Sequence, residues 1–111
     1  MENLLKDPDM DEAVIEFLDE SRQLIMSLEN TLEDFEERPT EYKLLEKFGQ
    51  EIDRIMGAAK SLGANKTGKI CELGKIIGYK SSQCIDEDLH QIVLAFLFDA
   101  VEVLQLSLIH I

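Results

Sequence analysis

Apolar residues recur at intervals of three and four positions through most of this chain, the spacing that gathers side chains on one face of an α-helix. The pattern predicts four helices, over residues 10–37, 40–62, 66–79 and 86–108. The first is expected to end at Arg38, because a residue before proline is driven out of the helical conformation, and Gly63 is a natural stop for the second. No stretch shows the period of two that marks a half-buried strand. Four helices with short connections predict an all-α fold, an up-down-up-down antiparallel four-helix bundle that makes one domain of residues 1–111.

The first two helices each present one continuous apolar face. The expected core residues are Val14, Phe17, Leu18, Ser21, Leu24, Ile25, Leu28, Leu32 and Phe35 in the first helix and Leu45, Phe48, Ile52, Ile55, Ala59 and Leu62 in the second. Gly49 and Gly57 lie inside the second helix, where each costs about 1 kcal/mol relative to alanine. Both therefore need a reason other than helix stability. In the third helix, Leu73 or Gly74 completes an apolar face, and Gly74 would allow close approach to a neighbouring helix.

The fourth helix is apolar on almost every side. We assign to the core Leu89, Ile92, Val93, Phe96, Ala100, Val103 and Leu104. A second set remains as a candidate oligomer face, Leu94, Leu97, Phe98 and Val101. Every helix of a four-helix bundle has an outer side, so part of this apolar surface should meet a partner protein or a second copy of the chain in a homodimer. The alternative is that the N-terminal segment, with Leu4 and Leu5, folds back over it.

The charge of the chain limits its partners. A formal net charge of −12 argues against nucleic acids and anionic membrane surfaces, which need basic patches. The charge is uneven, with −12 on residues 1–53, +5 on residues 54–84 and −5 on residues 85–111. The basic middle is either an ordinary solvated surface or a face for an acidic partner. No apolar run approaches the ~20 residues of a membrane span and the acidic N-terminus lacks signal-peptide features, so a cytoplasmic location is expected.

Metal and cofactor chemistry has little support in the sequence. Cys71 and Cys84 are 13 residues apart with no CxxC spacing, and the chain has two histidines. This pattern is neither a zinc site nor a disulfide framework, so we expect no metal, no cofactor and reduced thiols. Cys71 is expected in the core, and the environment of Cys84 stays open.

The stretch IDRIMGAAKSLG, residues 52–63, carries a family resemblance. It resembles the signature of histidine-phosphotransfer (HPt) domains, in which a histidine is followed three and four residues later by lysine and glycine, then by small residues and a Leu-Gly pair. The matching residues are Gly57, Ala58, Ala59, Leu62 and Gly63. Residues 17–36, residues 70–73 and the helix after Asp86 extend the resemblance over nearly the whole chain. The family implies a four-helix bundle with an exposed reactive imidazole, and partners that are response-regulator receiver domains or histidine kinases.

Two departures from the signature decide the predicted chemistry. Asp53 occupies the histidine position and Met56 the lysine position. A carboxylate on an exposed helix, without an acidic pocket and bound Mg²⁺, is a poor phosphoryl acceptor. Asp53 also has the simpler interpretation of an ordinary surface residue. His90 is followed four residues later by leucine rather than glycine, so we interpret it as a surface or helix-start histidine, and phosphotransfer through it is the least favoured hypothesis.

The sequence therefore predicts a non-enzymatic, pseudo-HPt interaction module. It would dock a receiver domain or a histidine kinase without passing phosphate, on a surface that includes Asp53, Arg54, Met56, Gly57 and Lys60, with the basic segment meeting the acidic phosphorylation site of a receiver. Gly57 either leaves clearance for a partner or allows close helix packing. Met56 either adapts to a partner or fills the core. The alternative function is a structural or oligomerisation bundle that uses the apolar fourth helix.

Overall fold

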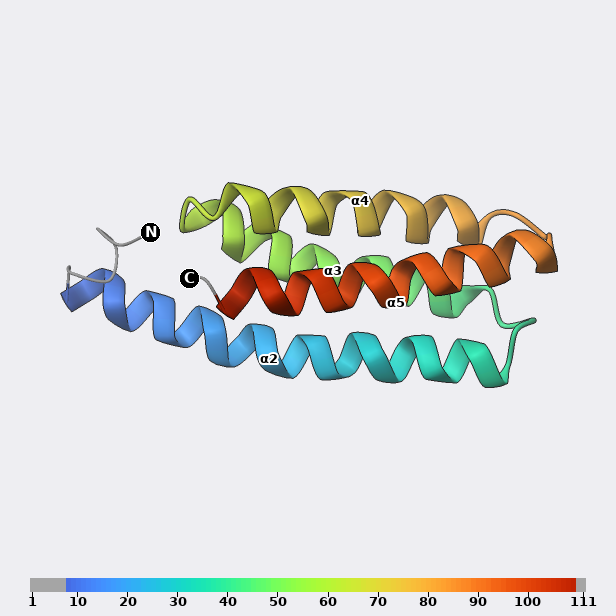
Figure 1. The fold of residues 1–111 in the computed structure, drawn as a ribbon, viewed down its shortest axis with the longest axis horizontal. Helices are drawn as coiled ribbons and strands as arrows, with labels where there is room; N and C mark the ends of the chain where they lie inside the picture. The colour runs from blue at the N-terminus through green and yellow to red at the C-terminus, as the bar shows by residue number, and fades with distance from the viewer. Residues whose placement is uncertain (1–7, 110–111) are drawn as a thin grey trace.

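The structure, a computed structural model, describes the backbone of residues 8–109 and the side chains of residues 12–109. It contains four helices, α2 (Pro8–Glu37), α3 (Lys43–Ser61), α4 (Asn65–Ser82) and α5 (Glu87–Ile109), and no strand within residues 8–109. The helices lie side by side in an elongated bundle of 48 × 19 × 18 Å (Figure 1). The prediction of an all-helical four-helix bundle is confirmed. The expected fold-back of Leu4 and Leu5 lies outside the described residues.

The helix boundaries lie close to the residues in the sequence that end or cap helices. α2 ends at Glu37, directly before Arg38 and Pro39, and Gly63, with a φ of +76°, lies just after α3. α3 begins at Lys43 rather than at residue 40, because the carbonyl of Arg38 accepts the Glu41 N–H and holds that segment in a turn. α5 begins after Asp86, whose Oδ1 accepts the Leu89 N–H at 3.1 Å, a side-chain cap of the helix N-terminus.

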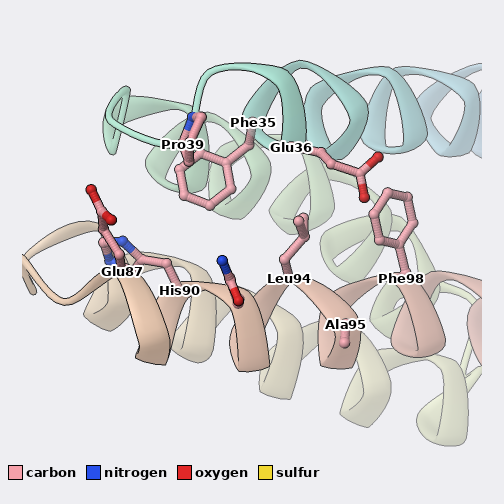
Figure 2. A pocket seen from close by; sticks show the side chains of 9 residues that line it. Phe35, Glu36, Pro39, Glu87, His90, Leu94, Ala95 and Phe98 are labelled. Atoms are coloured by element: carbon pink, nitrogen blue, oxygen red, sulfur yellow. The ribbon is translucent and has the colours of Figure 1, made fainter.

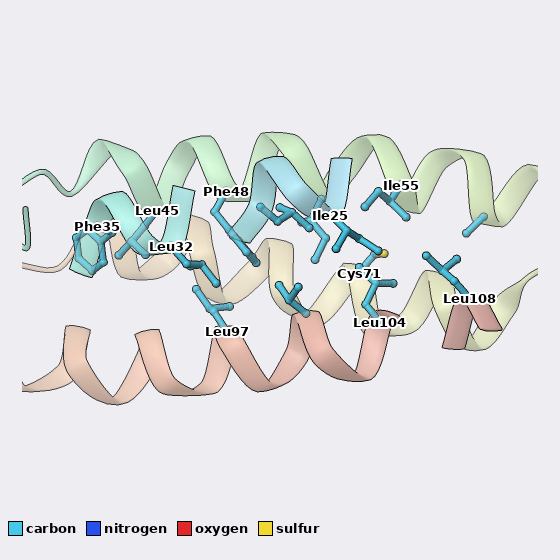
Figure 3. Packing of buried hydrophobic residues seen from close by; sticks show 14 of the residues in the cluster. Ile25, Leu32, Phe35, Leu45, Phe48, Ile55, Cys71, Leu97, Leu104 and Leu108 are labelled. Carbon is cyan, nitrogen blue, oxygen red and sulfur yellow. The ribbon is translucent and has the colours of Figure 1, made fainter. Parts of the chain in front are cut away.

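The core runs along the centre of the bundle and draws on all four helices (Figure 3). The faces predicted for α2 and α3 are confirmed, since every residue assigned to them is buried or packs partly buried against the core. Cys71 contributes to this core from α4, as expected. The exposed fraction of Leu73 is 57%, so Gly74, which is buried, is the residue that completes the inner face of α4.

Glycines bring α3 and α4 unusually close together. A Cβ atom at Gly78 would lie 3.0 Å from the Leu45 carbonyl oxygen, and one at Gly74 would lie 2.8 Å from Ile52 Cδ1. On the opposite helix, a Cβ at Gly49 would lie 3.2 Å from the ring of Tyr79. Close packing therefore explains why Gly49 stands inside a helix, and the predicted role of Gly74 is confirmed.

The face of α5 that packs inward differs in part from the one predicted. Leu97 and Val101, assigned to an oligomer face, are 0% and 2% exposed, and Leu94 and Phe98 pack partly buried against the core. The buried residues of this helix are His90, Val93, Leu97, Val101, Leu104 and Leu108. The residues left outside include Leu89, Ile92, Phe96 and Val103, which were assigned to the core. The assignment of faces on α5 was therefore wrong at these residues, whereas Val93 and Leu104, also assigned to the core, are buried as predicted.

The error has a physical origin. α5 carries two apolar stripes, each with intervals of three and four residues, so periodicity alone cannot choose between them. The charged residues in the middle of α5 show which of the two stripes faces the core. At 100° per residue, Asp99 and Glu102 both lie on the side opposite the stripe through Leu97 and Val101. Their direction was the signal that would have oriented the helix.

His90 is also placed differently from the prediction. It is 2% exposed, not a surface residue, and its Nε2 lies 2.9 Å from the Ser81 carbonyl oxygen at the end of α4. That contact assigns the proton to Nε2. The ring packs edge-on against Phe35 and is tilted against Tyr42, with centroids 5.7 and 4.7 Å away. The imidazole therefore belongs to the core at the end of the bundle.

By length and composition alone, α5 could also cross a membrane, contrary to the expectation that no segment approaches a membrane span. This is weak evidence for a membrane protein, because a core helix of a soluble bundle passes the same test. In this structure α5 supplies six buried residues to the core.

Candidate functional site

The candidate site is one side of α3, bordering α4. The three- and four-residue intervals place Asp53, Met56, Gly57 and Lys60 together there, and we call these four residues the 53–60 face. Arg54 is exposed but lies about 100° around the helix from Asp53. The structure therefore brings together four of the five predicted docking residues and sets the fifth apart.

Asp53 is held by a lysine from the neighbouring helix. Lys75 Nζ on α4 donates a hydrogen bond to Asp53 Oδ1 at 2.9 Å, and both side chains remain partly exposed. The hydrogen bond to Asp53 raises the pKa of the Lys75 ammonium. A positive charge therefore stands beside position 53 although Met56 occupies the lysine position of the HPt signature. Sequence spacing could not find this pair, since it depends on the register of α3 against α4.

Gly57 lies on open surface. A Cβ atom added there would have nothing within 4 Å, in contrast to the crowded positions of Gly49, Gly74 and Gly78. Close helix packing therefore does not explain Gly57. Around it, the stem of Lys60 lies over Gly68 of α4, where an added Cβ would be 3.3 Å from Lys60 Cγ.

Met56 is half-buried and packs against the core cluster. It fills space under the 53–60 face and leaves part of its side chain accessible. Both interpretations of Met56 are thus compatible with its position. The buried part of its side chain fills the core, and the exposed part is accessible to a partner.

A buried carboxylate lies between α2 and α3, on the opposite side of α3 from Asp53. Glu51 is 8% exposed and accepts hydrogen bonds from the hydroxyls of Ser27 and Thr31, the latter at 2.6 Å. Sequence reasoning did not single out this group, because only apolar residues and Ser21 were assigned to the core faces of these two helices. The signal was its position, three residues after Phe48 and four before Ile55 on the core face.

A pocket of about 480 Å³ lies between the end of α2 and the first half of α5. Leu94 and Phe98 extend from α5 toward α2 across it (Figure 2), in agreement with their partial burial against the core. His90 forms part of the wall, but its Nδ1 is buried and has no hydrogen-bond partner. The pocket thus offers an apolar lining with Glu36 and Glu87 among its lining residues, and no accessible imidazole.

Few side chains of residues 12–109 are placed for covalent or metal chemistry. Burial raises the pKa of the Cys71 thiol to about 12, so this thiol stays protonated and unreactive at neutral pH. Cys84 is exposed and free. Among these described residues, no three His, Cys, Asp or Glu side chains are grouped so as to hold a metal ion.

Comparisons of this chain with protein-family models, with curated proteins and with solved structures found no match. The resemblance to HPt domains therefore depends on the motif residues themselves.

Proposed function

We propose that this chain is a pseudo-HPt interaction module of two-component signalling, an up-down-up-down bundle that docks a receiver domain or a histidine kinase in the cytoplasm and transfers no phosphate. The antiparallel arrangement is supported by contacts that reverse chain direction. Thr67, at the start of α4, donates to Ser107, at the end of α5, whereas Ser81, at the end of α4, contacts His90. Such a bundle presents the 53–60 face on its flank.

The observation that carries the proposal is the open space at Gly57. A glycine in a helix interior costs about 1 kcal/mol relative to alanine. The other glycines inside α3 and α4 have close neighbours that account for them, and Gly57 has none. A role outside the fold, clearance for the backbone of a docked partner, accounts for it.

The proposed loss of phosphotransfer is supported by the state of the acceptor candidates. Asp53 is engaged by Lys75 and has no cluster of carboxylates around it that would hold Mg²⁺ within residues 12–109. His90 is buried against Phe35 and Tyr42, out of reach of a phosphoryl donor. An imidazole must be accessible to attack a phosphoryl group, and a carboxylate acceptor needs bound Mg²⁺. Neither His90 nor Asp53 therefore fits the role of acceptor.

Docking is tested by a binding screen against the receiver domains and histidine kinases of the host. For a partner found in this way, Gly57→Trp and Lys60→Glu should each weaken binding at least tenfold, because the first fills the clearance and the second reverses a charge on the same face. Lys47→Glu is the matched control, since Lys47 is also exposed on α3 but lies on another side of it. Equal effects of Lys60→Glu and Lys47→Glu, or no bound partner in the screen, would contradict docking at this face.

The absence of phosphotransfer has a separate test. The chain is incubated with an autophosphorylating kinase and ATP, and with receiver domains charged by acetyl phosphate. We expect no labelled chain in either reaction. Label on His90 or Asp53 would replace the interaction module with an active phosphotransfer protein.

A second candidate function, a structural or oligomerisation bundle, is favoured by the apolar residues exposed on α5. It uses different elements from the 53–60 face. A dimer that binds no receiver or kinase would select it.

A further inference from the structure

A second apolar stripe runs along the outside of α5. Leu89, Ile92, Phe96 and Val103 follow one another at intervals of three, four and seven residues, with the half-buried Ala100 between the last two. These four large side chains are between 39% and 69% exposed. Intervals of three and four residues are those of a seam along which one helix packs against another. The stripe therefore has the form of a helix-packing surface.

α4 extends this surface sideways. The Thr67–Ser107 and Ser81–His90 contacts set α4 and α5 antiparallel, and they bring Leu73 level with the segment of α5 near residue 99. Leu73 is 57% exposed, and its helical position is on the same side of the bundle as the α5 stripe. We call Leu73, Leu89, Ile92, Phe96 and Val103 the α4–α5 face.

The two helices of this face carry opposite charge. α4 contains four lysines and one glutamate, whereas α5 contains four acidic residues and no lysine or arginine. Lys69 and Lys80 flank the apolar surface on α4, and Asp88 and Asp99 flank it on α5, in each case on the edge away from the other helix. The face is therefore apolar at its centre and complementary to itself at its two edges.

The opposite charges of α4 and α5 favour one orientation of the twofold axis that would relate two copies of the chain. A twofold axis parallel to the helices lays α4 of one copy on α5 of the other, which opposes lysines to carboxylates at both edges. That arrangement sets Lys80 level with the start of the other copy's α5, where Asp88 lies, and Lys69 within about one turn of Glu102, in the half of α5 that also holds Asp99. A twofold axis across the helices would lay α4 on α4 and α5 on α5, like charge on like charge.

The size of the face suits a dimer. The 23 residues of α5 extend over about 34 Å, and the bundle is 19 Å wide. The product is about 650 Å² of flat area, and the accessible area of a surface with side chains is larger. Stable interfaces bury about 800 Å² per partner. An anionic membrane is a poorer occupant for a chain with a net charge of −12.

We propose that the α4–α5 face is the interface of a homodimer, in which a second copy of this chain packs α4 on α5 about a twofold axis parallel to the helices. The proposal does not depend on the docking function, because the 53–60 face lies on α3. The two can fail separately.

The first test is the mass of the chain in solution, measured by analytical ultracentrifugation between 1 and about 100 μM, a range that covers typical weak dimers. We expect twice the 12.6 kDa of the monomer at the upper end. Phe96→Glu should convert the dimer to a monomer of unchanged helicity by circular dichroism. Ile15→Glu is the matched control, an exposed apolar residue on α2, and should leave the dimer intact. A monomeric wild type, including one that binds lipid vesicles, or a Phe96→Glu dimer would overturn the proposal.

The second test addresses the symmetry. The variants Lys69→Glu/Lys80→Glu and Asp88→Lys/Asp99→Lys should each weaken their own dimer at least tenfold, because each brings like charges together at the edges. An equimolar mixture should restore the dimer, since each variant then meets the opposite charge. If α4 packed on α4, reversing the charges of one helix would leave like charge on like charge. Unchanged dimerisation of both variants would therefore exclude the proposed axis.

Discussion

Two buried polar side chains of this bundle, Glu51 and His90, take their partners from other helices. Glu51 on α3 is held by Ser27 and Thr31 of α2, and His90 on α5 is held by the Ser81 carbonyl of α4. A buried carboxylate is tolerated only where such hydrogen bonds replace those it would make to water. Removing the carboxylate leaves the hydroxyl donors without an acceptor. These residues therefore fix how neighbouring helices align along their length.

The contribution of Glu51 can be measured. Glu51→Ala removes the acceptor of two hydroxyls, one of them on the fully buried Thr31, so it should lower the free energy of unfolding by about 2–3 kcal/mol. The measurement is urea unfolding followed by circular dichroism. Glu36→Ala, at an exposed position, should change the free energy by less than about 0.5 kcal/mol. Equal effects of the two substitutions would show that the buried network is not stabilising.

Cys71 gives the stability a pH dependence. Burial raises the pKa of its thiol from 9.0 to about 12, so between these values the unfolded chain loses the Cys71 proton and the folded chain keeps it. Raising the pH through this window therefore favours unfolding. From pH 8 to pH 10 the wild type should lose about 1.4 kcal/mol more stability than Cys71→Ala. Parallel unfolding curves for the two proteins at both pH values would rule out this role of the thiol.

At the scale of helices, glycine has opposite meanings at two positions. Gly57→Ala adds a Cβ where there is open space and should stabilise α3 by up to about 1 kcal/mol. Gly78→Ala places a Cβ 3.0 Å from the Leu45 carbonyl oxygen, and the backbone cannot yield without parting α3 from α4, so it should destabilise the protein. Thermal unfolding of both variants decides the matter. A destabilising Gly57→Ala would mean that Gly57 serves the fold.

The elements with one apolar stripe were predictable, and the contacts between elements were not. α2 and α3 have a single stripe each, so their core faces follow from spacing alone. α5 has two, and its orientation required the direction of Asp99 and Glu102. At the candidate site, helical spacing correctly placed Asp53, Met56, Gly57 and Lys60 on one side of α3. The partner of Asp53, Lys75, lies on α4, and its position along the bundle depends on how α4 packs against α3, which the sequence does not give. Glu51 was not singled out because the core faces were traced mainly through apolar residues, and His90 was assigned to the surface or to the helix start.

The whole molecule presents two separate surfaces, the 53–60 face and the α4–α5 face. If the second joins two copies, folding and association are coupled, because only the folded bundle presents it. The midpoint of thermal unfolding should then rise with protein concentration for the wild type and stay constant for Phe96→Glu. Differential scanning calorimetry at two concentrations tenfold apart measures this. Unfolding midpoints that are independent of concentration for both proteins would show that folding is not coupled to dimerisation.

The glycine contact between α3 and α4 also bears on the order in which the bundle comes apart. These two helices are joined by only three residues and their backbones approach closely, so their contacts are both dense and local in sequence. We expect this helical hairpin to be the last unit to open. In native-state hydrogen exchange, amides in the middle of α3 and α4 should then outlast those of α2 and α5. The pair would act as the nucleus on which the longer first helix and the last helix assemble.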